Sequence, residues 1–132
     1  MFTVDITDFL AQECMRDYSA SAAEIGANAG AYTWQACIDN APEWKFLKPE
    51  NFDDFRAFVR SSGGWNDDEI NAWNDNELQA LCLQWIAADV RECGIDKPGA
   101  DWTKIRAGQE SGFIPSSIYR DESGRVFWEC VQ

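Results

Sequence analysis

The chain has 132 residues, a length that suits one domain with a substantial hydrophobic core. Its apolar fraction of 45% is ordinary, but 7 Trp and 8 Phe make it rich in aromatic residues, which excludes disorder of the whole chain. With 23 acidic and 11 basic residues the net charge is −12, so the chain should repel nucleic acids and anionic lipids and attract basic protein surfaces.

Most of the negative charge lies in the first part of the chain. Residues 1–92 carry 17 acidic and 6 basic side chains, whereas residues 93–132 carry 6 and 5. We therefore predict one domain over 1–132, made of an acidic helical part, 1–92, and a nearly neutral part, 93–132, with a short helix and a β-hairpin.

Apolar periodicity and helix start and stop signals predict the helices of the acidic part. A first helix is expected over about residues 5–17, and a second begins near Ser21, which has capping-box spacing to a following Glu. Residues 40–50 contain two prolines and predict a loop packed on the core. A third helix is expected over 49–60, and the Ser-Ser-Gly-Gly sequence at 61–64 ends it.

A six-residue signal occurs twice, as Trp-Asn-Asp-Asp-Glu-Ile at 65–70 and Trp-Asn-Asp-Asn-Glu-Leu at 73–78. In each copy the Asn is placed to cap a helix, the Glu three residues later closes a capping box, and the Trp can pack on the following Ile or Leu. The pattern predicts a short helix at 67–73 and a long central helix at 75–92. Two capped helix starts explain every residue of the repeat without a functional role.

The last part of the chain predicts a short helix near 101–107 and two β-prone runs around Asp121-Glu122-Ser123-Gly124. A hairpin is only marginally stable alone, so it must pack on the helices or extend another sheet. The expected fold class is α+β, mostly α, with five to six helices and a C-terminal β-hairpin.

The cysteines and the absence of histidine restrict the chemistry. Without histidine there is no Ser-His-Asp or Cys-His mechanism and no His-ligated metal site. An EF-hand over 66–77 is rejected because Ile70 and Asn71 stand where an oxygen ligand and a glycine belong. We expect no metal and no cofactor, and reduced thiols that act as small hydrophobes, with a disulfide between two of them as the alternative. The cysteines are Cys14, Cys37, Cys82, Cys93 and Cys130.

The first residues, Met-Phe-Thr-Val-Asp, contain no basic region followed by an apolar run, so we expect no signal peptide. No apolar stretch approaches the length of a membrane span. The expected location is the cytoplasm.

Carboxylates concentrated at the predicted helix starts of residues 50–77 are the candidate partner-binding residues. Spread over rigid helices, they can occupy a basic protein groove that otherwise holds nucleic-acid phosphates. Trp65 and Trp73 would add anchoring if exposed. The alternative is a solvated acidic surface that only keeps the protein soluble. The candidate residues are Asp53, Asp54, Asp67, Asp68, Glu69, Asp75 and Glu77.

The size and composition resemble small acidic proteins that bacterial phages and plasmids encode against host defences, the anti-CRISPR and anti-restriction proteins. The stretch from Tyr32 to Glu92, with Phe-Arg-x-x-Val-Arg-Ser-Ser-Gly-Gly-Trp at 55–65, also resembles proteins of such mobile elements. The resemblance implies binding to a CRISPR effector complex or a restriction enzyme, and from the net negative charge we expect no direct contact to nucleic acid or membrane. It transfers no functional residue.

Two other functions remain open at the level of the sequence. One is a scaffold or assembly protein that pairs through the edge of the C-terminal hairpin. The other is an enzyme that uses carboxylates or a cysteine in a pocket lined by Trp. No residue spacing supports the enzyme.

Overall fold

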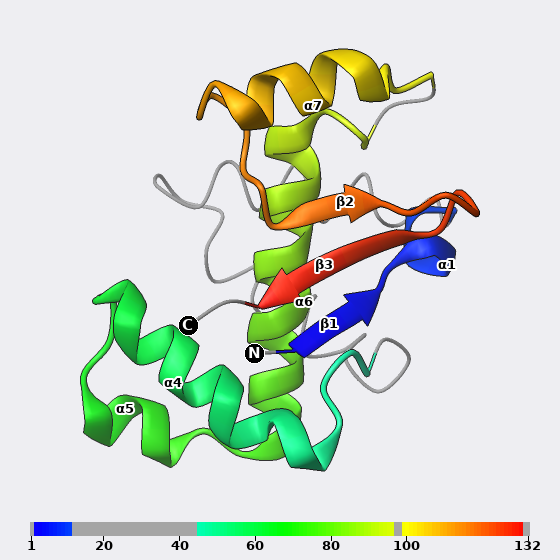
Figure 1. Cartoon of the computed structure of the whole chain (residues 1–132). Coiled ribbons are helices and arrows are strands. Elements are labelled where there is room, and N and C mark those ends of the chain that lie inside the picture. Colours follow the sequence, from blue (N-terminus) through cyan, green and yellow to red (C-terminus); the bar gives the residue numbers. More distant parts are fainter. Residues whose placement is uncertain (1, 12–44, 97–98, 131–132) are drawn as a thin grey trace.

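The computed structural model describes residues 2–11, 45–96 and 99–130. Within them the chain forms five α-helices, one 3₁₀ turn and one three-stranded antiparallel sheet, so the expected mixed and mainly helical class is confirmed (Figure 1). The helix expected near Ser21 and residues 40–44 of the expected loop lie outside the described residues. The elements are β1 (Phe2–Asp5), α1 (Thr7–Leu10), η1 (Pro49–Asn51), α4 (Phe52–Ser62), α5 (Asp67–Ala72), α6 (Asp75–Cys93), α7 (Trp102–Glu110), β2 (Ile118–Arg120) and β3 (Val126–Cys130).

The start of the chain differs from its prediction. A helix was expected from Asp5, but residues 2–5 form strand β1, and helix α1 begins only at Thr7. Val4 is buried while its neighbours Thr3 and Asp5 are exposed, which is the alternation of a strand with one face in the core. The Asp5 carboxylate accepts a hydrogen bond from the Thr7 backbone N–H, which ends the strand and starts the helical turn.

The helix signals of residues 49–94 are confirmed. Pro49 opens the 3₁₀ turn that leads into α4, and α4 ends at Gly63, which has the left-handed φ of 77° that glycine adopts without strain. Both halves of the capping box form at Asn66, whose side chain accepts from the Glu69 N–H at 2.9 Å. The Asn74 side chain also caps α6, accepting from the Glu77 N–H at 2.9 Å, but the return hydrogen bond from the Asn74 N–H to the Glu77 side chain is not formed, so the second predicted capping box is only half present.

Helix α6 is the centre of the molecule, as its apolar pattern predicts. More than half of its side chains are buried, on several sides of the helix, because other elements surround it. A buried amide on this helix, Gln79, accepts from the Leu47 N–H at 2.9 Å and donates to the Leu47 carbonyl at 2.6 Å. This double hydrogen bond fixes the segment that leads into η1 and α4.

The predicted hairpin is confirmed, and it is extended by a strand that was not predicted. β3 lies in the middle of the sheet, with β1 and β2 antiparallel to it on either side. Trp128 of β3 stands opposite both Val4 and Ile118, and all three side chains point into the core. The sheet therefore joins the first described residues of the chain to the last ones.

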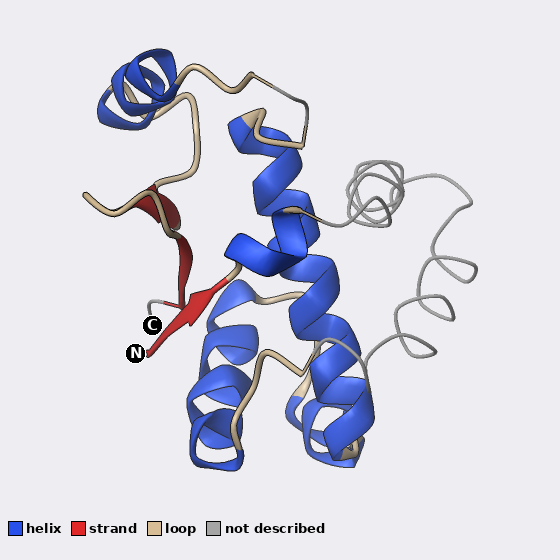
Figure 2. Cartoon of the chain, turned by 90° about the vertical axis from the view of Figure 1, so that its right-hand side faces the viewer, coloured by secondary structure: helices blue, strands red, loops and turns tan. Residues whose placement is uncertain are grey.

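The sheet lies on one side of α6, with α7 near one end of the helix and α4 near the other (Figure 2). Trp128 is the largest fully buried side chain, and Phe58 of α4 contacts it edge to face at 6.0 Å. Trp85 of α6 contacts the same Phe58 at 4.8 Å. These three aromatic rings connect the two helices to the sheet.

Candidate functional site

The predicted acidic residues lie in the first turns of three consecutive helices. We call η1, α4, α5 and the first turn of α6, residues 49–78, the acidic block; it forms the lower part of the view in Figure 1. Five of the seven carboxylates are exposed, and Asp54 and Glu77 are half-buried. Acids at these positions also interact favourably with the helix dipoles.

At the start of α5 some of the charge has a structural role. Arg60, in the last turn of α4, contacts the Asp67 carboxylate at 3.0 Å and donates to the Asn71 side chain at 2.8 Å. Glu69 accepts from the Asn66 N–H in the capping box. Asp68 is exposed and has no ion pair or hydrogen bond with any described side chain or backbone group. It is the acid of this group that is free to meet a partner.

The starts of α4 and α6 lie beside each other, because Phe52 and Asp75 line the same hollow of about 300 Å³. Asp53 is fully exposed, and its carboxylate oxygen Oδ1 lies 3.9 Å from the Arg56 guanidinium, a distance at which an ion pair is weak. Asp75 is exposed as well. The seven carboxylates thus form two groups, one at each end of α4. Seven residues of helix separate Asp53 from Arg60, roughly 10 Å at 1.5 Å per residue.

Trp65 and Trp73 are half-buried and do not stand out as anchors. Their rings meet edge to face at 5.5 Å, and Trp65 lies 6.3 Å from Trp85. The Arg56 guanidinium donates to the Trp73 carbonyl at 3.1 Å. The two indoles therefore pack α5 against α6 through contacts between tryptophans, and the expected packing of each Trp on the following Ile or Leu stays a prediction.

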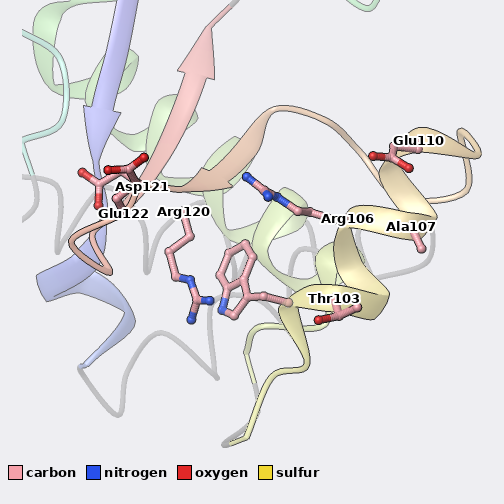
Figure 3. A pocket seen from close by; sticks show the side chains of 8 residues that line it. Thr103, Arg106, Ala107, Glu110, Arg120, Asp121 and Glu122 are labelled. Atoms are coloured by element: carbon pink, nitrogen blue, oxygen red, sulfur yellow. The ribbon is translucent and has the colours of Figure 1, made fainter.

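A groove of about 740 Å³ lies between α7 and the hairpin and was not predicted. Arg106 of α7 and Arg120 of β2 extend into it, while Asp121 and Glu122 lie at the hairpin turn (Figure 3). The Arg120 guanidinium stacks on the Trp102 ring at 5.1 Å from its centroid. Two basic and three acidic side chains line the groove, so it has no strong preference for one sign of charge.

The acid at the hairpin turn has a local role. One oxygen of Asp121 accepts hydrogen bonds from the backbone N–H and hydroxyl of Ser123 and from the N–H of Arg125. The Ser123 hydroxyl, more than the backbone bonds, lowers the pKa of this carboxyl. Asp121 therefore fixes the turn.

A second pocket missed by sequence reasoning, about 350 Å³, contains a partly buried carboxylate, Asp89 of α6. Its Oδ2 accepts hydrogen bonds from the Trp128 indole N–H at 2.7 Å and the Ser117 hydroxyl at 2.8 Å. Burial raises the pKa of Asp89, and these two hydrogen bonds offset only part of that rise. The signal in the sequence was an acid inside a helix that is apolar on most sides.

The three described cysteines, Cys82, Cys93 and Cys130, are free and belong to the core, whereas Cys14 and Cys37 lie outside the described residues. Burial raises the pKa of Cys82 well above its ordinary value, and the neighbouring Cys130 thiol adds to the shift. Burial also raises the pKa of Cys93 and of Cys130 to about 12. These thiols carry almost no thiolate at neutral pH and are poor nucleophiles.

The free edge of the hairpin is short. The Ser117 carbonyl and the Asp121 N–H face β3, so the backbone of Ile118 faces outward by the alternation of a strand. The outward carbonyl of Ile118 already accepts a hydrogen bond from the Gln109 side chain at 2.6 Å. This edge of β2 therefore offers little backbone to a partner strand.

No protein-family model, curated protein or solved structure matches this chain. In the ranges that the structure describes, no group of three or more acidic or cysteine side chains has the arrangement of a metal site. None of the described helices is long and apolar enough to cross a membrane. The functional argument therefore rests on the geometry and charge of the described residues.

Proposed function

We propose that this chain is a non-catalytic protein-binding inhibitor that acts in the bacterial cytoplasm. The acidic block docks on a basic groove of a nucleic-acid-processing complex, a CRISPR effector or a restriction enzyme, and excludes the nucleic acid from it. The observation that carries the proposal is the gathering of seven carboxylates at three helix starts within one part of the molecule. The resemblance in size and composition to anti-CRISPR and anti-restriction proteins supports the class of partner.

The two groups of carboxylates are close enough to act together. The helix rise between Asp53 and Arg60, roughly 10 Å, is comparable to the Debye length of about 8 Å at physiological ionic strength, so a basic surface that approaches α4 interacts with both groups. Long-range attraction of this kind speeds association and weakens as salt is added. Because Asp53, Asp68 and Asp75 are exposed and only Asp53 has a nearby described cation, at 3.9 Å, their charge is directed at the solvent and at a partner.

The two alternative functions receive less support from the structure. Assembly through the hairpin would need a free strand edge, and the Ile118 carbonyl of β2 is already bound by Gln109. Cysteine catalysis would need a thiolate, and burial raises the pKa of each described thiol. Neither the hairpin edge nor a catalytic cysteine uses the exposed acids of the acidic block, and carboxylate catalysis would need two acids facing one cleft, whereas five of these seven carboxylates are exposed.

The test is capture of partners by the tagged full chain from a CRISPR- and restriction-proficient bacterial lysate, quantified by mass spectrometry at low and moderate salt. The key variant combines Asp53→Asn, Asp68→Asn and Asp75→Asn, which removes three exposed charges and no capping side chain. We expect the wild type to capture a nucleic-acid-binding complex. Added salt, added nucleic acid and the triple variant should each release it.

A matched control removes the same charge elsewhere, with Glu92→Gln, Glu110→Gln and Glu122→Gln, all of them exposed. This control should retain capture, which separates the acidic block from the net charge of the chain. Equal losses in both triple variants, or capture that ignores salt and competing nucleic acid, would contradict the proposal.

A further inference from the structure

The pocket around Asp89 is formed by three parts of the chain that are distant in sequence. Helix α4 contributes Phe58, helix α6 contributes Asp89, and the hairpin contributes Trp128 and Glu129. Two serines directly before β2 complete the lining, which encloses about 350 Å³. The pocket is separate from the seven carboxylates of the acidic block, so it is judged on its own geometry.

The Asp89 carboxylate is held in a fixed orientation. Both of its described hydrogen bonds, from the Trp128 indole and the Ser117 hydroxyl, reach the same oxygen, Oδ2. The other oxygen, Oδ1, accepts no hydrogen bond from the described part of the chain, and it is not among the fully buried polar atoms. Because Trp128 is only 1% exposed, its indole N–H is held in place by the core and cannot turn to the solvent instead. One oxygen is thus used to orient the group, and the other is available to a ligand.

The charge of this pocket is negative and uncompensated. Its lining contains two acids, Asp89 and Glu129, and no basic side chain. The ion pairs made by the described arginines go to Asp53, Asp67 and Asp5, so none of them neutralises the pocket. A partly buried carboxylate without a counter-charge is costly, and burial accordingly raises the pKa of Asp89. A cation that entered the pocket would offset this cost.

The pocket wall favours an organic cation of planar shape over a metal ion. The half-buried ring of Phe58 forms part of the lining, whereas the Trp128 ring is buried and its indole N–H is used by Asp89. A guanidinium group stacks on an aromatic ring such as that of Phe58, and its five N–H donors match a carboxylate together with hydroxyl oxygens. Two carboxylates are too few for the ligand shell of a hard metal ion such as Ca²⁺. We propose that this pocket binds an arginine side chain of a protein partner, with Asp89 Oδ1 as its acceptor and the negative charge of Glu129 nearby.

A titration followed by NMR tests this proposal on the isolated full chain. The probe is Nα-acetyl-arginine amide, and the matched neutral probe is Nα-acetyl-citrulline amide, which has nearly the same shape without the charge. The readout is the assigned indole N–H resonance of Trp128, which donates to Asp89 in the free protein. We expect a saturable shift with the arginine probe and none with the citrulline probe.

Variants separate binding from the structural role of Asp89. Asp89→Asn keeps an oxygen that can accept from Trp128 and Ser117, and it should weaken the arginine probe about tenfold, the loss expected for one charge-assisted hydrogen bond. Glu129→Gln changes a half-exposed side chain and serves if Asp89→Asn does not fold. Glu110→Gln, an exposed acid on α7, is the control and should bind as the wild type does.

Three results would overturn the proposal. They are an equal shift with the citrulline probe, no shift of the Trp128 resonance at saturating arginine probe, and unchanged affinity in both Asp89→Asn and Glu129→Gln. Any of them would leave Asp89 as a group that only ties the hairpin to α6. None of them bears on the acidic block, so the proposed function is tested separately.

Discussion

Replacing Gln79 by Leu tests whether one buried amide holds the segment that leads into the acidic block. Gln79 is 5% exposed, and its side chain exchanges two hydrogen bonds with the backbone of Leu47, at 2.9 and 2.6 Å. The arrangement resembles the pairing between two strands, with a side chain in place of one of them. It holds residues 45–48 against α6 and so fixes where η1 and α4 begin.

The expected magnitude follows from the groups that would lose their partners. A leucine has a similar size but cannot bind the Leu47 N–H and C=O, and Leu47 is only 3% exposed. Each buried polar group left without a partner costs roughly 1–3 kcal/mol. We expect the free energy of unfolding to fall by about 2–6 kcal/mol, nearer the lower value if water reaches Leu47 through the hollow that it lines.

The assay is urea unfolding followed by tryptophan fluorescence, with an unchanged dependence on urea as the sign that only stability has changed. Gln84→Leu is the matched control, because Gln84 is half-buried on the same helix and has no hydrogen bond with a described residue. It should alter stability by no more than about 0.5 kcal/mol. The reasoning is refuted if both variants lose the same stability, or if Gln79→Leu behaves as the wild type.

Three further predictions follow from local features. Burial alone would raise the pKa of Asp5, but hydrogen bonds from Arg125 and Thr7 lower it from 3.8 to about 2. Because the Asp5–Arg125 ion pair is largely exposed, Asp5→Asn should lower the free energy of unfolding by at most about 1 kcal/mol at pH 7. The difference in stability between variant and wild type should disappear as the pH falls through 2. Gly63→Ala should destabilise by about 1–2 kcal/mol in the same assay, since φ is 77° there, whereas Gly64→Ala should have a smaller effect. Cys82 should react with iodoacetamide only in the unfolded chain, because burial raises its pKa; equal rates in the folded and unfolded states would contradict this.

Features set by neighbouring residues could be predicted from the sequence. The capping box at Asn66, the side-chain cap at Asn74 and the two ends of the long helix depend on contacts within three or four residues, and both helix starts lie where the repeat indicates. Gly63 and Gly94 end α4 and α6 for an equally local reason, their positive φ. The turn at Asp121–Gly124 likewise follows from its own residues.

Strand β1 was missed because its partner is far away in the chain. Phe2 pairs with Cys130, so the pairing cannot be deduced from residues near the start. The alternation of Phe2, Thr3, Val4 and Asp5 was a signal for a strand, but it is short, and its last residue was assigned to the start of the predicted helix.

The two unpredicted pockets have the same explanation. The Asp89 pocket brings together residues from α4, α6 and β3, and the groove of Arg106 and Arg120 forms only when α7 lies beside the hairpin. The sequence shows which residues are acidic, but it does not show that they form two groups, one at each end of α4. That division depends on α5 starting beside Arg60, a contact made by folding.

Hydrogen exchange of the full chain, alone and with the complex that it captures, tests the central claim most directly. If the acidic block docks on a basic groove, backbone amides of residues 50–78 should exchange more slowly in the complex, and added salt should remove the difference. Protection confined to α7 and the hairpin, residues 102–130, or no captured complex at low salt, would contradict the account.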